Sequence, residues 1–487
     1  MIETLMPSEK ENESEILMKM TEKKEEEDIQ LTSRKPLILS GISLILILAA
    51  LALILFFVFK ENEDNQNYIL AKYLIKDTKT YNKIFHDSYK DFIEKMTING
   101  TEVAIDNNII FDKLGNYEVN ITFKDKMEKL DNFFDNIQIL GEVDLSNLFD
   151  EDIISTSDMF YNCTNLKKVV FGDFLPQKLE NVSNMFAGCR SIQILDADVF
   201  TSDTIKDMNG LFYNCSTLEN INFGDFNCKN VINMSKLFSG CSSLAVADFF
   251  EMKNFQTDNV IDMSYMFQNC SRLKRLDLRN FITSKVIYMN NMFDSCSNLV
   301  EMQITNNKFN TKNVVTMYHM FSNCAKLTSL TLNFDTRNVV NMSAMFKGCT
   351  KLHSLDITSF NTSKVTDMGE MFSNCRELNN FNIPNFDVRN VVNMYGMFQK
   401  CSSLYSLNLS NFDTINLTEA SYLFSDCTLL QTLCLNQFTT VKIKGSENFF
   451  DGIGVRGSLY FNSTIFNQSK ISLIYGWKYH DVAKTKI

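Results

Sequence analysis

The sequence lacks the concentrated basic clusters that bind nucleic acids. Its 487 residues carry 47 lysines and arginines against 58 aspartates and glutamates, which gives a formal net charge of −11. A nucleic-acid-binding surface must neutralise a run of phosphates, so it needs a patch or stripe of positive charge. The composition therefore argues against a nucleic-acid partner.

The chain also lacks the short motifs of common catalytic chemistries. It has no Gly-x-Ser-x-Gly elbow, no His-Glu-x-x-His, no Walker A loop and no Gly-x-Gly-x-x-Gly. No pair of carboxylates is singled out for acid–base work. The four histidines are scattered along the chain: His86, His319, His353 and His480. We therefore expect neither an enzyme nor a cofactor.

Metal-binding patterns are missing as well. There is no Cys-x-x-Cys pair and no histidine cluster that would supply a zinc geometry. There is also no Asp-x-Asp-x-Asp-Gly loop, and single turn residues such as Asp335 and Asp387 usually bond to their own backbone. We expect no metal site.

What the sequence does contain is a repeat. Eleven cysteines recur at intervals of 26 residues, apart from three gaps of 25, 28 and 29, and each follows a phenylalanine by three positions. A fixed period of this length indicates stacked copies of one small structural unit, a solenoid. These ladder cysteines are Cys163, Cys189, Cys215, Cys241, Cys270, Cys296, Cys324, Cys349, Cys375, Cys401 and Cys427.

One unit, residues 260–278, illustrates the expected local structure. Its apolar residues between Val260 and Leu273 follow the three- and four-residue spacing of one helical face. The following Leu273-x-x-Leu276-x-Leu278 alternates with polar residues, as a short strand does. This pattern predicts an α/β repeat in which every rung has a short helix, a short strand and a loop.

The ends of the repeat differ from its middle. Phe134 and Phe450 continue the phenylalanine series, but Ile137 and Ile453 stand where the cysteine would be. We count these as end rungs, which makes about 13 in all. The predicted solenoid spans 127–455, after a small β cap at 97–126 and before a C-terminal cap at 456–487.

A long apolar run lies near the N-terminus. Residues 37–59 contain no charge over 23 positions, which as a helix would measure roughly 34 Å and cross a bilayer. Lys23, Lys24, Arg34 and Lys35 precede this run, whereas acidic residues follow Lys60. The positive-inside rule then predicts a single-pass type II membrane protein with extracellular repeats.

The alternative for this run is a cleaved signal peptide, because Ala50-Leu51-Ala52 resembles a cleavage site. The apolar residues continue beyond that site, and a charged tail precedes the run, so we favour an uncleaved anchor at 37–59. Residues 1–35 are interpreted as a disordered cytoplasmic tail, and residues 61–96 as a helical stalk.

The ladder cysteines could form disulfides or bind metal, but core packing is the favoured interpretation. Each lies on the apolar face, where a thiol behaves as a small hydrophobic group. Two further cysteines, Cys228 and Cys434, lie off the ladder. They are eight rungs apart and cannot pair with each other. They are interpreted as two unpaired thiols, with an intermolecular disulfide as the alternative.

The outward positions of the strands are the candidate binding face, because solenoids use such surfaces for recognition. This face is polar, of mixed charge and free of aromatic residues, and a plain solvated surface is the alternative. Its candidate residues are Arg275, Asp277, Glu301, Gln303, Ser329, Thr331, Ser354, Asp356, Asn380 and Asn382.

Asn-x-Ser/Thr sequons also follow the apolar run, and in a secreted region they would be candidates for glycosylation. Five examples are Asn99, Asn120, Asn214, Asn361 and Asn462.

Segments such as MFSNCRELNNFNIPNFDVRNVVNM (371–394) and MFKGCTKLHSLDITSFNTSKVTDM (345–368) resemble the repeat of BspA-like leucine-rich-repeat surface proteins. The similarity covers about residues 127–455. It implies a leucine-rich-repeat solenoid, display on a cell surface, and a role in adhesion or recognition.

Together these features predict a cell-surface adhesion or recognition protein that binds extracellular proteins or glycans without catalysis. Another copy of the chain, in a homo-oligomer, is a further candidate partner. One alternative is a structural coat or spacer without a dedicated ligand. Another is a single-pass receptor that signals through residues 1–35.

Overall fold

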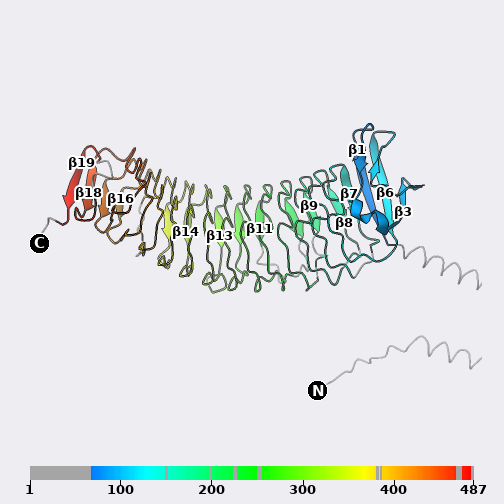
Figure 1. Ribbon diagram of the computed structural model, residues 1–487, viewed down its shortest axis with the longest axis horizontal. Coiled ribbons are helices and arrows are strands. Elements are labelled where there is room, and N and C mark those ends of the chain that lie inside the picture. The colour runs from blue at the N-terminus through cyan, green and yellow to red at the C-terminus, as the bar shows by residue number, and fades with distance from the viewer. Residues whose placement is uncertain are drawn as a thin grey trace, which may run out of the picture. The chain divides into compact units, whose positions relative to one another are not determined.

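The computed structural model describes residues 67–148, 152–172, 174, 176–196, 200, 202–222, 228–248, 255–305, 307–379, 383, 386–467 and 474–483. All of them belong to one compact unit, Asn67–Ile487. Within this unit, a small β cap leads into a stack of turns that follow one another in chain order (Figure 1).

The cap is built on antiparallel strands. Its main sheet has the order β4-β3-β6-β1, and β1 then pairs with β7, the first strand of the solenoid. The cap therefore extends the solenoid sheet and covers the edge of its first strand. Its elements are β1 (Tyr68–Ile75), β2 (Asn82–Lys83), the 3-10 helix η1 (Asp87–Phe92), β3 (Ile93–Ile98), β4 (Thr101–Val103), β5 (Asn108–Ile109) and β6 (Gly115–Phe123).

The described solenoid strands are short and parallel, and each lies in a different turn. In the order of the chain they are β7 (Leu140–Asp144), β8 (Lys168–Val170), β9 (Ile194–Asp196), β10 (Asn220–Asn222), β11 (Val246–Asp248), β12 (Arg275–Asp277), β13 (Glu301–Gln303), β14 (Ser329–Thr331), β15 (Ser354–Asp356), β16 (Ser406–Asn408) and β17 (Thr432–Leu435). The last sheet continues into β18 (Gly457–Phe461) and β19 (Trp477–Asp481), which close the C-terminal end.

A second backbone ladder runs on another side of the stack. Single parallel bridges join one residue of each turn to the equivalent residue of the next, from Lys129↔Ser155 through to Glu419↔Gly445. Together with the strands, these bridges define a β-solenoid of about eleven regular turns, one for each ladder cysteine, with a less regular turn at each end.

The core is a stack of like residues. The phenylalanine before each ladder cysteine is buried and lies parallel to its counterpart in the next turn, with ring centroids 5.2–6.1 Å apart from Phe134 to Phe450. Offset-stacked pairs of this kind contribute about 0.5–1.5 kcal/mol each beyond their burial. Phe267, Phe346 and Phe398 of the phenylalanine series are examples of this buried stack.

The predicted helix in each rung is wrong. Among the described residues the only helix is the single 3-10 turn η1 in the cap. In the example unit, the backbone N–H groups of Tyr265 and Phe267 donate to Asn290 O and Met292 O of the next turn, at 3.0 and 2.9 Å. An α-helix needs those N–H groups for its own carbonyls four residues back. The fold is therefore a β-solenoid, and the predicted α/β solenoid of leucine-rich-repeat type, with a helix in every rung, is wrong.

Left-handed residues explain how the chain makes these turns. Tyr265 has φ of 60° and Asn269 has φ of 58°, and two such residues four positions apart recur in the other turns. The intervening N–H groups close tight turns, for example from Gln268 N to Tyr265 O at 3.0 Å. Consecutive tight turns place every third or fourth side chain inward, so they produce the apolar spacing that also suits a helix.

One expectation for the N-terminal part also changes, and two others fall on residues that the structure does not describe. The segment expected as a helical stalk at 61–96 contains the strands β1 and β2 and the start of β3 where it is described. The helix expected at 37–59 and the tail at 1–35 lie outside the described residues.

None of the residues that the structure describes form a helix with the length and apolar character needed to cross a membrane. The prediction of a single-pass membrane protein with extracellular repeats is not supported, and we withdraw it.

Candidate functional site

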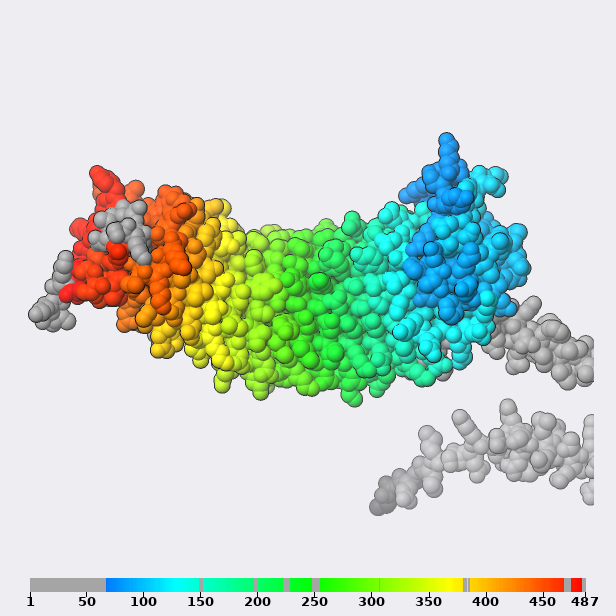
Figure 2. Space-filling model, viewed as in Figure 1, coloured from blue at the N-terminus to red at the C-terminus, as the bar shows by residue number. Residues whose placement is uncertain are grey.

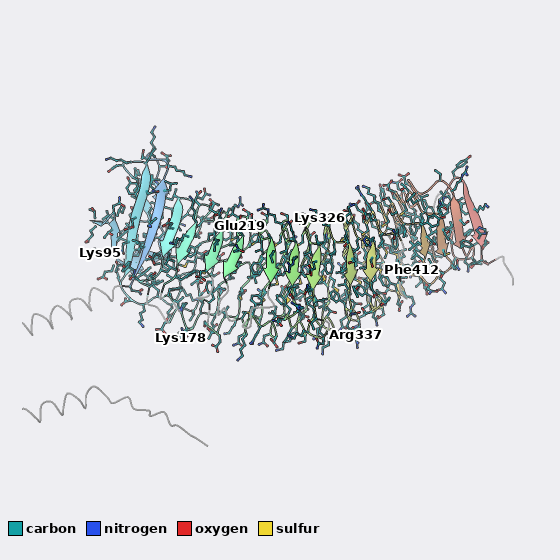
Figure 3. The ribbon with its side chains drawn as sticks, turned by 180° about the vertical axis from the view of Figure 1, so that it is seen from behind. Lys95, Lys178, Glu219, Lys326, Arg337 and Phe412 are labelled. Carbon is teal, nitrogen blue, oxygen red and sulfur yellow. The ribbon has the colours of Figure 1, made fainter. Side chains whose placement is uncertain are left out.

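The strand face consists of the outward residues of the parallel strands, seen as a row of arrows in Figure 3. Register places Arg275 beside Glu301 and Asp277 beside Gln303. In the next sheet, Ser329 lies beside Ser354, and Thr331 lies beside Asp356. The predicted positions Asn380 and Asn382 lie outside the described residues.

The centre of the strand face carries a charged network. Arg275 Nε lies 3.7 Å from Glu301 Oε2. The Arg275 side chain is two-thirds exposed, and the Glu301 side chain is half exposed. The Gln303 amide donates to Glu301 Oε1 at 2.6 Å. Arg279 forms an ion pair with Asp277, in which Nη2 lies 2.6 Å from Oδ2. Exposed pairs of this kind add little stability, so their main effect is to hold the side chains in a fixed pattern.

Hydrogen bonds lower the pKa of two carboxyl groups of this face, those of Asp277 and Asp356. The hydrogen bond from Arg279 lowers the pKa of Asp277. In another turn, the backbone N–H of Thr358 and then its hydroxyl lower the pKa of Asp356. A ligand that approaches the strand face at neutral pH therefore meets charged carboxylates beside the guanidinium groups.

The face is nearly flat. The hollow between Arg275, Asp277, Glu301 and Gln303 measures about 20 Å³. Cavities that enclose small ligands are typically about 300–1,000 Å³. This surface can contact a broad or extended ligand, but it cannot enclose a small molecule.

The ladder cysteines are buried, and all thirteen cysteines of the chain are thiols. In the solenoid interior each ladder Sγ donates to the carbonyl oxygen of the ladder phenylalanine in the preceding turn, at 2.9–3.2 Å. Burial raises the pKa of the thiols, to about 12 for Cys215 and Cys349. These cysteines are core residues, as the sequence indicated.

The two off-ladder cysteines differ from each other. Cys228 is buried, and burial raises the pKa of its thiol. Cys434 is half-buried on β17, and desolvation also raises the pKa of its thiol. An intermolecular disulfide through Cys228 would require the chain to open, so Cys434 is the better placed of the two.

The five sequons lie at different depths. Asn99 and Asn361 are exposed, whereas Asn120, Asn214 and Asn462 are half-buried. The Asn361 Oδ1 accepts from Ser363 N at 3.1 Å, which closes a turn. Exposure favours Asn99 and Asn361 as acceptors, and glycosylation remains a prediction.

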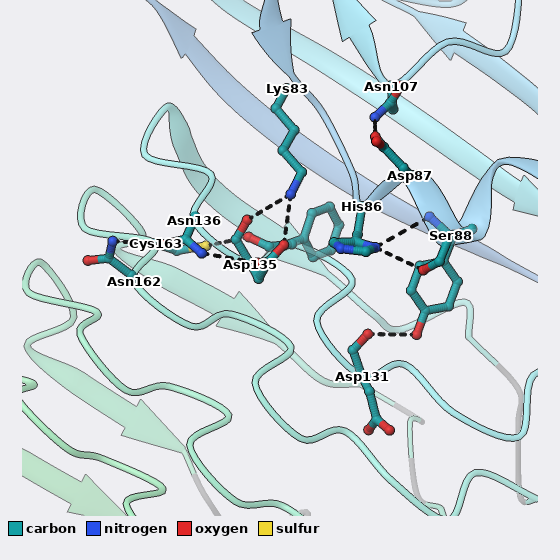
Figure 4. Close-up of polar contacts among 12 residues, drawn as sticks. Lys83, His86, Asp87, Ser88, Asn107, Asp131, Asp135, Asn136, Asn162 and Cys163 are labelled. Carbon is teal, nitrogen blue, oxygen red and sulfur yellow. Dashed lines mark hydrogen bonds and ion pairs between the residues drawn. The ribbon is translucent and has the colours of Figure 1, made fainter.

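Polar contacts fix the cap to the first turn (Figure 4). Lys83 Nζ lies 2.8 Å from Asp135 Oδ1. Asn136 in turn bonds to Asp135 and accepts from Asn162 Nδ2 at 2.9 Å. His86 Nδ1 accepts from Ser88 N at 3.3 Å and so begins η1. These residues have structural partners, and the described residues contain no group of three or more candidate metal ligands.

An aromatic cluster that the sequence did not reveal lies on the side of the solenoid formed by the tight turns. The hydroxyls of Tyr265 and Tyr318 meet at 3.1 Å although a full turn lies between them, and Asn290 Nδ2 donates to Tyr318 Oη at 3.2 Å. The Lys236 Nζ lies 5.9 Å from the Tyr265 ring. The signal in the sequence was the variable residue pair between each Met and the following Met-Phe or Leu-Phe, such as Ser264-Tyr265 and Tyr318-His319, which is buried or half-buried in these turns.

A repeated strand, a repeated bridge and a stacked core define this chain as a repeat β-solenoid protein. The family model described as "Mycoplasma protein of unknown function, DUF285" matches residues 128–249, 206–326, 243–355, 295–381 and 349–458. These overlapping segments cover more than half of the chain, so the protein belongs to the DUF285 family. Comparison with curated proteins gives no match.

Proposed function

We propose that this protein is a recognition scaffold that binds protein or glycan ligands along its strand face and carries out no catalysis. The observation that carries this proposal is the flat, in-register row of outward side chains centred on Arg275 and Glu301, which is polar apart from exposed apolar residues such as Val246 beside Arg275. Many weak contacts along one stiff surface can add up to useful affinity through multivalency.

Two further points support a recognition role. The repeat resembles that of BspA-like surface proteins, which implies adhesion or recognition. The backbone of β12 is paired on both sides, by β11 and β13, so its outward side chains Arg275 and Asp277 start from fixed positions. Preorganisation lowers the entropic cost of binding.

The chemistry of the thiols supports the absence of catalysis. A cysteine nucleophile needs a low pKa and access to substrate. The ladder thiols have raised pKa values and are buried under phenylalanine rings. A catalytic centre elsewhere would need groups that the described part of the strand face does not bring together.

The test compares wild-type full-length protein with the variant Arg275→Ala, Asp277→Ala, Glu301→Ala and Gln303→Ala. Binding is measured on an array of defined glycans and on a panel of immobilised matrix proteins. We expect this quadruple variant to bind the partner of the wild-type protein with at least tenfold lower affinity. The control Asp335→Ala with Arg337→Ala removes a similar ion pair, at 2.8 Å, at a loop corner, and Figure 3 labels Arg337 away from the strand arrows.

If both variants bind as the wild type does, the alternative of a structural spacer without a dedicated ligand is favoured. The receptor alternative depends on residues 1–35, which lie outside the described residues. No structural observation favours it.

A further inference from the structure

A large hollow lies where the cap meets the first turns. It measures about 600 Å³ and lies beside β1, β6 and β7, with Lys72, Lys76, Asn116, Tyr117 and Lys167 in its wall. The blue cap and the cyan first turns form one continuous surface in the space-filling view (Figure 2). The volume falls within the range of about 300–1,000 Å³ for binding cavities.

A second hollow continues the first along the stack. It measures about 520 Å³ and shares Lys167, and its wall also includes Arg190, Ser191, Gln193 and Thr217. Because Lys167 lies in both walls, the two hollows are neighbours on the surface, one beside the cap and one beside the turns of β8 and β9. We call the two together the cap groove.

The wall of the cap groove carries four cations, Lys72, Lys76, Lys167 and Arg190, against the two carboxylates Glu118 and Glu142. The groove is therefore locally positive in a protein of net charge −11. Of its cations, Lys72 is held by Glu142 at 3.0 Å. Lys76, Lys167 and Arg190 form no ion pair with any residue that the structure describes. The wall of the second hollow contains no carboxylate. Glu219, whose N–H bonds to Gln193 O of the turn before, ends the positive run.

The kinds of groups in the wall indicate the ligand. Three cations without ion pairs share the wall with the amides of Asn116 and Gln193 and with the hydroxyls of Ser191 and Thr217. Amides and hydroxyls suit the hydroxyl groups of sugars, and isolated cations suit widely spaced carboxylates or sulfates. We propose that the cap groove binds an acidic polysaccharide.

A nucleic acid fits the same groove less well. It carries one phosphate per nucleotide, about 3.4 Å apart along each strand, and the groove offers three cations without ion pairs. Single strands also bind through bases stacked on exposed aromatic faces. The groove wall offers Tyr117, which is half-buried and whose hydroxyl donates to Lys113 O at 3.0 Å. The groove wall includes Glu142 of β7 and Ile194 of β9 but none of the four residues varied to test the strand face, so this proposal does not depend on the one made for that face.

The test measures binding of fluorescein-labelled hyaluronan and heparin oligosaccharides to the full-length protein by anisotropy. The variant Lys167→Glu with Arg190→Glu is compared with Lys274→Glu and Lys326→Glu. Both double variants lower the net charge by four. Lys274 and Lys167 have equivalent positions, because each follows the ladder cysteine of its own turn by four residues. The backbone N–H of Lys167 donates to Gly141 O, and that of Lys274 donates to Ala245 O, in each case in the preceding turn.

We expect at least a tenfold loss of affinity in the groove variant and less than a twofold change in the control. Affinity should also fall as salt is raised, because exposed charges are screened. Hyaluronan carries carboxylates and heparin also carries sulfates, so the pair shows which anion is preferred. Equal melting temperatures for the two variants exclude misfolding as the cause.

The proposal is overturned if both double variants lose the same affinity, or if the wild-type protein binds neither acidic oligosaccharide. It is also overturned if neutral dextran binds as tightly as the acidic oligosaccharides, or if a single-stranded oligonucleotide binds more tightly than either of them. The quadruple alanine variant of the strand face should still bind heparin as the wild type does. That result would show that the cap groove and the strand face are two different sites.

Discussion

The thiol of Cys375 donates to the carbonyl oxygen of Phe346 in the preceding turn, with Sγ 3.1 Å from the oxygen. The contact repeats at every ladder cysteine from Cys163 to Cys427. A thiol is a weak donor that is also small and apolar. Cysteine therefore fits a buried position that has room for one heavy atom beyond Cβ and that faces a carbonyl group.

Replacing Cys375 by alanine should destabilise the solenoid. The change removes a buried sulfur, leaves a small void and deletes one weak hydrogen bond, so we expect the free energy of unfolding to fall by about 1–2 kcal/mol. Urea denaturation followed by circular dichroism measures this loss. The control Cys434→Ala changes a half-buried thiol and should alter stability by less than about 0.5 kcal/mol. Equal effects of the two changes would contradict a core role for the ladder.

Thiol reagents should distinguish the buried cysteines from the half-buried one. Twelve cysteines are buried, and Cys434 is half-buried. At neutral pH we expect native protein to react with Ellman's reagent at no more than one thiol, and all thirteen to react after denaturation in guanidinium. Fast reaction of several thiols in the native state would show that the ladder is open to solvent.

The same thiols predict alkaline destabilisation. Burial raises the pKa of Cys215 and Cys401 from 9.0 to about 12 in the folded chain. The folded state holds these protons more tightly, so their contribution to stability is fully present below pH 9. It is lost as the pH rises from 9 towards 12, by at most about 1.4 kcal/mol per pH unit for each thiol. Melting temperatures measured from pH 7 to 11 should fall steeply above pH 9. A flat profile would rule out this linkage.

Lys400 has φ of 61°, in the left-handed region where glycine is favoured, and its side chain is exposed. Lys400→Gly should therefore stabilise the fold by about 0.5–1 kcal/mol, because relief of backbone strain exceeds the added freedom of the unfolded chain. The matched change Lys444→Gly lies at an exposed residue outside the left-handed set and should destabilise by a similar amount. Thermal unfolding of both variants provides the measurement, and the same sign for both would refute the argument.

The pair Tyr265 and Tyr318 should be energetically coupled. Burial, and then the hydrogen bond with Tyr265, raise the pKa of Tyr318 to about 12. In a double-mutant cycle with Tyr265→Phe and Tyr318→Phe, we expect a coupling energy of about 0.5–1.5 kcal/mol. An additive cycle would mean that the two hydroxyls contribute independently.

The sequence predicted the core well but not the backbone. Val260, Met263, Phe267 and Cys270 were expected on one buried face, and all four are buried. The helix assigned to the same residues was wrong, because apolar spacing alone does not distinguish a helix from consecutive tight turns. The difference lies in the partner of each N–H group, and that partner is in the next turn.

The candidate sites show the same limit. The outward residues of the strand face could be assigned from alternation within a single strand. The cap groove could not, because Lys76, Lys167 and Arg190 are far apart in the chain and meet only after folding. A scan for basic clusters along the sequence does not detect such a surface.

By itself, the sequence determined the length of the repeat, the residues that face inward and the stacking of like upon like, since these follow from the spacing of apolar side chains. The tertiary structure alone decided that each turn bonds to its neighbour instead of to itself. A lone turn cannot satisfy its own N–H groups in this conformation, and the stack supplies the missing acceptors.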